Sequence, residues 1–177
     1  MRPVASSSED DLPTSDDVVA EFRRALHDPE HRPTRRVEAR LVDLLRSNLA
    51  QWNLEDEARG PGTDAAAVAG AKRAIDELNA GRHLIVEEID VAIDRAVAQT
   101  ASAPLATESP AMAFDRLSVL VIRIHHTERD ADRYTARLPV LYRQLADLQQ
   151  AIDGLIDDVR DGTRRFVPYQ SLKLYGE

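Results

Sequence analysis

The chain has 177 residues, of which 43% are hydrophobic and 31% charged, and it carries a formal net charge of −8 and no cysteine. This length suits one domain, and the composition is typical of a folded protein. The acidic charge disfavours nucleic acid as a partner, and the lack of cysteine excludes disulfides, thiolate nucleophiles and thiolate metal sites. The polar N-terminus, without an apolar run, argues against a signal peptide or membrane anchor, so we expect a cytoplasmic protein.

Residues 1–13 are polar and lack periodicity, and we predict that they form a flexible tail. Thr14 or Ser15 is suited to cap a short helix that ends before Asp28-Pro29. A second helix is predicted between Pro33 and the Gly-Pro-Gly sequence at 60–62. Its apolar stripe keeps helical spacing but contains polar members; it comprises Val37, Leu41, Leu44, Leu45, Asn48, Trp52 and Glu55.

A third helix, capped by Thr63 or Asp64, is predicted to run to about Gln99, roughly 50 Å at 1.5 Å per residue. After a loop over residues 100–110, Ser109 caps a fourth helix that extends to about Asp132 and is apolar on every side, so we expect it to be the buried central helix. The stripe expected to face the core on the third helix is Val68, Ala71 or Lys72, Ile75, Asn79, Arg82, Val86, Ile89, Ile93 and Val97.

A fifth helix is predicted from a regular leucine and isoleucine stripe that begins at Leu138 and is closed by Gly162. Residues 163–177 alternate aromatic and basic residues without helical period, and we expect an extended tail that packs on the bundle. The sequence therefore predicts an all-α domain over residues 14–162, a four- to five-helix bundle with a buried central helix and an extended C-terminal tail.

Polar side chains occupy or flank these core stripes, and burying them without partners costs several kcal/mol. Asp115 and His126 share one face of the fourth helix but lie eleven residues apart, about 16 Å, so any site must be assembled from several helices. The candidates are Trp52, Glu55, Asp56 and Arg59 on the second helix, Asn79 and Arg82 on the third, and Asp115, Arg116 and His126 on the fourth.

Three interpretations of these residues stay open. The first is a satisfied buried ion-pair network that sets the helix register. In the second, a pocket between helices holds an anionic group through Arg59, Arg82 and Arg116. Glu55 or His126 would then transfer the proton.

The third interpretation is a carboxylate-bridged metal site, which starts from the adjacent histidines at 125 and 126 followed by Glu128. Ferritin-like sites repeat a Glu-x-x-His motif on two helices, and that repeat is absent. Adjacent residues on a helix also point about 100° apart, so these histidines do not chelate one metal together. We therefore expect no metal and no other cofactor, and we expect His27, His31 and His83 at the surface.

The same segments resemble a bacterial family of domains of unknown function, family 4254. The resemblance covers about residues 40–175 and rests on several blocks. These are Trp52-Asn-Leu-Glu55-Asp56-Glu-Ala-Arg59, Lys72 to Asn79 with Arg82, Glu87 and Asp90, Ser109 to Leu120 with His126, Gln144, and Arg165 to Tyr175. The resemblance implies an all-helical fold but no established activity, because the family is uncharacterised. Its members occur near genes for glycan and natural-product biosynthesis.

The chain departs from that family around the third helix, where Ala80, His83 and Leu84 replace its usual Gln, Asn and Asp. His125 replaces the family's Tyr, and the C-terminal tail lacks the usual Asn-Asp-Pro. We therefore expect a remodelled polar network that handles a different small molecule.

Our leading hypothesis is a small metal-independent enzyme, or the helical subunit of one, in a bacterial biosynthetic pathway. Without a phosphate-binding loop or a nucleophile, the feasible reactions are proton transfers, eliminations and intramolecular displacements. In one version, Glu55 or Asp115 removes a proton from an amine or hydroxyl, and the ring closes as a sulfate or phosphate departs. A partner transferase, either a sulfotransferase or a kinase, would have installed that leaving group.

The alternative is a non-catalytic helical module that stabilises a partner enzyme. A closed network with every group paired would favour the module, and an open cleft lined by unpaired Glu55, Arg82 and His126 would favour the enzyme. The C-terminal tail carries Tyr and Leu, which makes a homodimer a further partner hypothesis.

Overall fold

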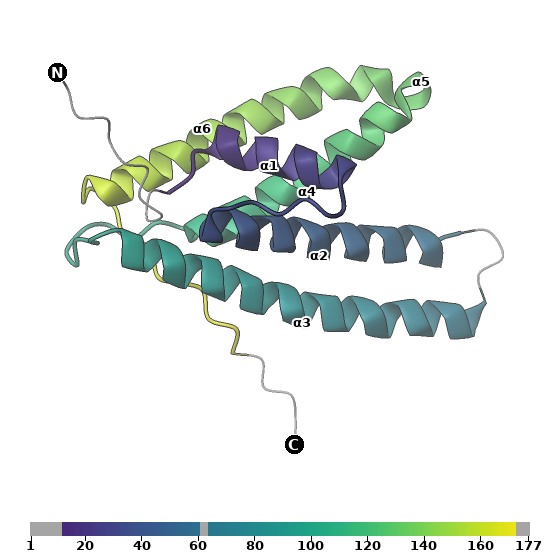
Figure 1. Ribbon diagram of the computed structural model, residues 1–177, viewed down its shortest axis with the longest axis horizontal. Coiled ribbons are helices and arrows are strands. Elements are labelled where there is room, and N and C mark those ends of the chain that lie inside the picture. Colours follow the sequence, from purple (N-terminus) through teal and green to yellow (C-terminus); the bar gives the residue numbers. More distant parts are fainter. Residues whose placement is uncertain (1–11, 61–63, 173–177) are drawn as a thin grey trace.

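Five long helices without a strand make up the part of the chain that the structure, a computed structural model, describes, residues 12–60 and 64–172 (Figure 1). The only β-type pairing among these residues is an isolated bridge between Leu105 and Arg165. The predicted all-α fold is therefore confirmed. The elements are α1 (Ser15–His27), α2 (Arg36–Ala58), α3 (Ala65–Ala96), α4 (Pro110–Arg129), the short α5 (Ala131–Tyr134), the 3₁₀ turn η1 (Thr135–Arg137) and α6 (Leu138–Arg160).

The helix boundaries follow local capping chemistry, as the sequence predicts. Thr14 caps α1 in a reciprocal capping box with Asp17, and Asp64 caps α3 by accepting a 2.7 Å bond from the backbone N–H of Ala67. Ser109 caps α4 directly before Pro110. Gly162 follows α6 with φ of +71°, a left-handed conformation that favours glycine.

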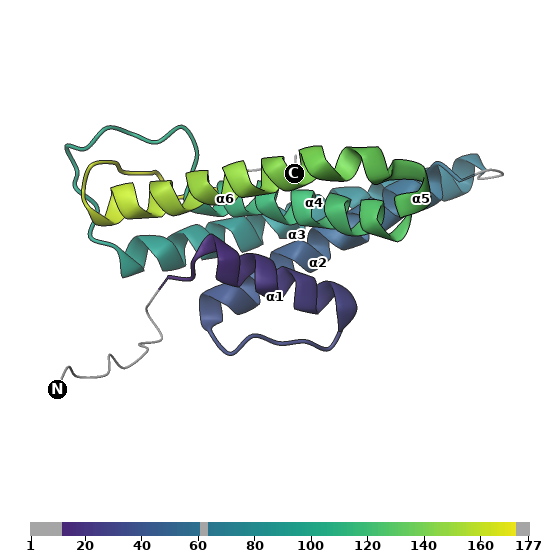
Figure 2. The same cartoon turned by 90° about the horizontal axis from the view of Figure 1, so that it is seen from above.

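The central position of α4 is confirmed, because this helix packs against α1, α2, α3 and α6 and most of its residues are buried. Figure 2 shows α6 and α1 on different sides of it. Phe114 on α4 and Phe22 on α1 are among the largest fully buried side chains. The core therefore lies where the predicted all-round apolar helix meets its neighbours.

The helices α2 and α3 are antiparallel and extend away from this core toward the right in Figure 1. We call residues 49–58 of α2 and 65–80 of α3 the arm, and the rest of the described chain the body. None of the arm's side chains is buried, and Val68, which the sequence analysis assigned to the core stripe, is 43% exposed. That assignment is wrong because the buried residues of α3 begin only at Val86, in the second half of the helix.

Residues 163–172 run in an extended conformation beside α3, and the remaining residues of the expected C-terminal tail lie outside the described residues. Phe166 is buried, and the backbone N–H of Tyr169 donates to Asp90 on α3. Most of the expected N-terminal tail also lies outside the described residues. Leu12 and Pro13, at its end, are buried against the body, because Leu12 belongs to the hydrophobic core cluster.

Candidate functional site

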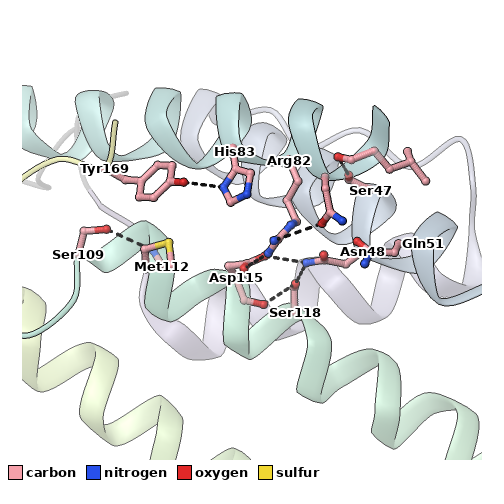
Figure 3. A network of polar contacts seen from close by, with 12 residues as sticks. Ser47, Asn48, Gln51, Arg82, His83, Ser109, Met112, Asp115, Ser118 and Tyr169 are labelled. Atoms are coloured by element: carbon pink, nitrogen blue, oxygen red, sulfur yellow. Dashed lines mark hydrogen bonds and ion pairs between the residues drawn. The ribbon is translucent and has the colours of Figure 1, made fainter. Parts of the chain in front are cut away.

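A network of polar side chains joins α2, α3 and α4 where the arm leaves the body (Figure 3). The amide nitrogen of Asn48 donates to Asp115 Oδ1 at 2.8 Å and lies 2.7 Å from Ser118 Oγ. Ser118 Oγ donates to the backbone carbonyl of Asp115 at 2.8 Å. Arg82 forms an ion pair with the second carboxylate oxygen of Asp115, and its other terminal nitrogen is 3.4 Å from Asn79 Oδ1.

This network occupies both oxygens of Asp115 with donors from the protein. The Asp115 side chain is 9% exposed and that of Arg82 is 21% exposed, so the pair is largely removed from water. Asp115 therefore serves as an anchor for Arg82 and Asn48.

An aromatic pair adjoins this network one helical turn further along α2. The rings of Trp52 and His126 are stacked, with centroids 5.2 Å apart and an interplanar angle of 6°. Asn48 and Trp52 are four residues apart on α2 and thus share one face. The stack and the polar network therefore follow one another along the seam between α2, α3 and α4, and we call the two together the junction centre.

Three buried nitrogen atoms of the junction centre have no hydrogen-bond partner among the described residues. They are Trp52 Nε1, Arg82 Nε and His126 Nε2. Leaving a buried polar atom without a partner costs about 1–3 kcal/mol, so native proteins contain few of them. Two of them belong to the ring stack and the third to the ion pair with Asp115, so the junction centre departs from the satisfied network of the first interpretation.

Burial lowers the pKa of His126 below the ordinary value of 6.5. The nearby carboxylate of Asp56 opposes this shift, and Arg129 adds to it. A lowered pKa keeps the imidazole neutral near pH 7, the form in which a ring nitrogen can accept a proton. His126 thus has the protonation state that a general base requires.

Three of the other predicted site residues, Glu55, Arg59 and Arg116, are not part of this centre. Glu55 pairs with Arg59 at 3.0 Å along the exposed surface of α2, and the Arg59 side chain is 73% exposed. Arg116 pairs with Glu108, and its side chain is 61% exposed. The expected convergence of three arginines on one anion does not occur, because Arg116 points about 100° away from Asp115 and Arg59 lies near the end of the arm.

A second polar centre, which sequence reasoning did not single out, surrounds Asp90. This side chain is fully buried and accepts hydrogen bonds from the backbone N–H groups of Ala111 at 2.9 Å and Tyr169 at 2.8 Å. Burial raises the pKa of Asp90, whereas bonds from Ser109, Tyr169 and Ala111 oppose the rise. Its spacing of four residues from the apolar Val86 on the same helix is the sequence feature that could have predicted its burial. The contacts indicate that Asp90 fastens the start of α4 and the C-terminal tail to α3.

The expectation that His83 lies on the surface is wrong in part. Its side chain is half-buried, with Nδ1 2.7 Å from the hydroxyl of Tyr169 and the two rings stacked at 5.4 Å. Figure 3 shows this pair beside Arg82. The C-terminal tail, which no local pattern on α3 reveals, covers His83.

No group of three or more metal-ligating side chains comes together anywhere in the residues that the structure describes. Within the same residues, no helix is long and apolar enough to cross a membrane. In comparison with known families, residues 38–167 match a model described as a protein of unknown function (DUF4254). No curated protein and no solved structure matches the chain.

Proposed function

We propose that this chain, which belongs to the DUF4254 family of proteins of unknown function, is an acid–base enzyme for an anionic small molecule. In this proposal His126 is the base, and Trp52 and Arg82 donate hydrogen bonds to the anion. The observation that carries the proposal is the set of three unpartnered buried nitrogens at the junction centre.

The chemistry of these atoms supports an anionic ligand. Trp52 Nε1 and Arg82 Nε both carry a hydrogen and are donors only, so a group that satisfies them must supply acceptor oxygens. Arg82 adds a positive charge that Asp115 already balances, and the additional anion would therefore be held by hydrogen bonds in a region of low dielectric. Carboxylate, sulfate and phosphate groups all offer such oxygens.

His126 supplies the base because its lowered pKa leaves the imidazole neutral and its Nε2 has no protein partner. Stacking on Trp52 fixes the orientation of the ring. One reaction that uses these features is ring closure. His126 Nε2 takes the proton of an amine or hydroxyl, the freed lone pair attacks a carbon of the same molecule, and the carbon–oxygen bond to a sulfate or phosphate breaks.

The departing anion takes both electrons of that bond, and the Trp52 and Arg82 N–H groups stabilise its developing charge. The leaving group must come from elsewhere, so a partner transferase, a sulfotransferase or a kinase, would act first. Such a pair of activities fits a bacterial biosynthetic pathway in the cytoplasm. Glu55, Arg59 and Arg116 have no part in this version, because their charges are paired at the surface.

Entry of a ligand requires movement, since the three nitrogens are out of contact with solvent. The arm is the element that would move in this proposal, because none of its side chains is fully buried and its contacts with the core cluster are made by the partly buried Leu49 and Trp52. Trp52 lies on the arm and His126 on the body. Separation of the two rings would therefore open the junction centre from the side of the arm.

The test uses variants that each remove one unpartnered nitrogen and keep an aromatic ring or the positive charge at that position. Trp52→Phe and His126→Phe retain a stacked pair, and Arg82→Lys retains the positive charge beside Asp115. Protein isolated from its native host would be examined by native mass spectrometry for bound small molecules. We expect an anion bound to the wild type and lost from each variant, with folding retained.

Arg116→Ala and Arg59→Ala are the matched controls, because they remove exposed arginines outside the junction centre. Both should keep the ligand. A ligand that persists in Trp52→Phe, His126→Phe and Arg82→Lys would contradict the proposal. So would its loss from Arg116→Ala alone.

A second candidate function is a non-catalytic module that stabilises a partner enzyme, and the exposed arm favours it. A two-helix arm without buried side chains gains little stability by itself, and a partner that covers it would supply the missing burial. Recovery of a protein partner that survives His126→Phe but is lost on Val68→Glu would support the module instead of the enzyme.

A further inference from the structure

A groove of about 860 Å³ lies between the start of α2 and the second half of α3. Its walls include Val37, Leu84, Val91 and Ala92, which make an apolar floor. Leu84 is 56% exposed, which is unusual for a large aliphatic side chain. None of the groove's residues belongs to the junction centre.

The charged side chains of the groove divide into paired and unpaired groups. Glu88 forms an ion pair with Arg40, and Glu87 accepts a 3.2 Å bond from the backbone N–H of Ser171. Arg36 and Arg95 are exposed and have no partner in the described part of the chain. Three arginines (Arg36, Arg40 and Arg95) against two glutamates (Glu87 and Glu88) leave the groove with one excess positive charge, in a protein of net charge −8.

The arrangement of these groups gives the groove two unlike ends. The helices α2 and α3 are antiparallel (Figure 1), and the Arg40–Glu88 ion pair shows which of their residues lie opposite each other. In that register, Arg36 lies toward the end of α3 that carries Arg95, and Leu84 lies at the opposite end. The start of α2 at Arg36 also lacks a side-chain cap, so its backbone N–H groups add to the positive potential at the cationic end.

We propose that this groove binds a single-chain amphiphile with an anionic head, such as a medium-chain carboxylic acid. The carboxylate is held between Arg36 and Arg95, and the hydrocarbon chain lies on Val91 and Ala92 and reaches Leu84. Eleven residues of α3 separate Leu84 from Arg95, about 16 Å, which suits an extended chain of about a dozen carbons. The volume lies within the range of about 300–1,000 Å³ that small-molecule sites occupy.

The test is isothermal titration calorimetry of the full-length protein with dodecanoate below its critical micelle concentration. We expect a single site whose affinity falls about fourfold for each CH₂ removed from the chain, because each CH₂ contributes buried apolar area. Dodecyltrimethylammonium, which carries the opposite charge on the same chain, should bind at least about tenfold more weakly.

The variant Arg36→Glu/Arg95→Glu should weaken dodecanoate binding at least about tenfold, and Leu84→Asn should flatten the dependence on chain length. The control is Arg73→Glu/Arg123→Glu, which makes the same change in net charge at exposed arginines outside the groove. Circular dichroism checks that each variant is folded. The control should bind as the wild type does.

Absence of dodecanoate binding, or equal binding of dodecyltrimethylammonium, would overturn the proposal. Equal affinity in the wild type and in Arg36→Glu/Arg95→Glu would also overturn it, because the head would then not be held by these arginines. The outcome is independent of the junction centre, since His126→Phe leaves the groove unchanged and should bind dodecanoate normally.

Discussion

The helices α2 and α3 run through both the body and the arm of this molecule, and yet their two parts differ sharply in burial. In the body these helices contribute fully buried side chains such as Leu41 and Ile89, whereas the arm contributes none. The junction centre lies where one region gives way to the other, with Trp52 on the arm and His126 on the body. Polar atoms without partners among the described residues are therefore found at the boundary between a region with fully buried side chains and one without them.

The largest expected contrast between the two regions is the cost of removing an apolar side chain. Phe114→Ala in the body should lower the free energy of unfolding by about 3–5 kcal/mol, because the side chain is 1% exposed and leaves a cavity. Ile75→Ala in the arm should cost about 1 kcal/mol, because the side chain is only half-buried. Urea unfolding followed by circular dichroism measures both values.

The same measurement can break the comparison. A loss for Ile75→Ala that approaches the loss for Phe114→Ala would mean that the arm is covered in solution. That result would favour the module or a homodimer, and sedimentation analysis of the wild type would then distinguish a second copy from a different partner.

A second contrast compares the partly buried ion pair between α3 and α4 with an exposed ion pair on α2. Asp115→Ala should cost about 3 kcal/mol, since it leaves the guanidinium of Arg82 largely buried without its counter-ion. Glu55→Ala breaks the exposed pair with Arg59 and should cost about 0.3–0.5 kcal/mol. Thermal unfolding of both variants gives the comparison, and the double variant Asp115→Leu/Arg82→Met should recover much of the loss if the charge is the cause.

These contrasts also indicate what the sequence could predict. Capping residues such as Thr14 and Ser109 identified helix starts because their chemistry is local, and the apolar surround of α4 predicted its central position. Helical spacing would also have predicted the pairing of Glu55 with Arg59, four residues apart, although we assigned both to a shared site.

The exposure of Val68 could not be predicted, because periodicity identifies the apolar face of a helix and not what covers it. The meeting of Arg82 with Asp115 depends on how α3 crosses α4, and the covering of His83 depends on the path of the C-terminal tail. Tertiary arrangement decides both, and the spacing of residues along one helix carries no information about it.

The titration of His126 gives a third prediction, which concerns how the stability of the folded state depends on pH. The folded state holds its pKa below 6.5, so the unfolded chain binds this proton at higher pH than the folded chain does. The stability that depends on the neutral ring is therefore complete above about pH 6.5 and declines as the pH falls through that value to the folded pKa. The pKa of His125 is lowered in the same direction, chiefly by burial, and adds to the decline.

Trp52 is the only tryptophan, and its ring is stacked on His126, so its fluorescence reports the titration directly. We expect a transition with a midpoint below pH 6.5 in the wild type and its absence in His126→Phe. A midpoint at or above 6.5 would mean that His126 is not desolvated, and the assignment of this residue as the base would lose its support. His31→Gln, which removes a histidine paired with Glu21 on the body, is the control that should leave the transition unchanged.

The smallest expected effect concerns Gly81, which stands on α3 between the arm and the body. A Cβ added at Gly81 meets no atom within 4 Å, and the same is true of Gly70 in the arm and Gly154 in α6. Substitution of any of the three by alanine should raise the free energy of unfolding by about 0.5–1 kcal/mol, because glycine loses more backbone freedom in a helix. Thermal unfolding should give similar gains in stability for the three variants. A special role of Gly81 in movement of the arm must therefore be sought with another measurement.

That measurement is amide hydrogen exchange in residues 65–80, combined with ligand capture. If the arm bends at Gly81 when the junction centre opens, Gly81→Ala should slow exchange along the arm and weaken capture of the anion, whereas Gly70→Ala and Gly154→Ala should change neither beyond their common gain in stability. Identical exchange in all three variants would mean that the arm opens by another route. Because local stabilisation is matched across the three sites, only the position of Gly81 at the junction can produce the difference.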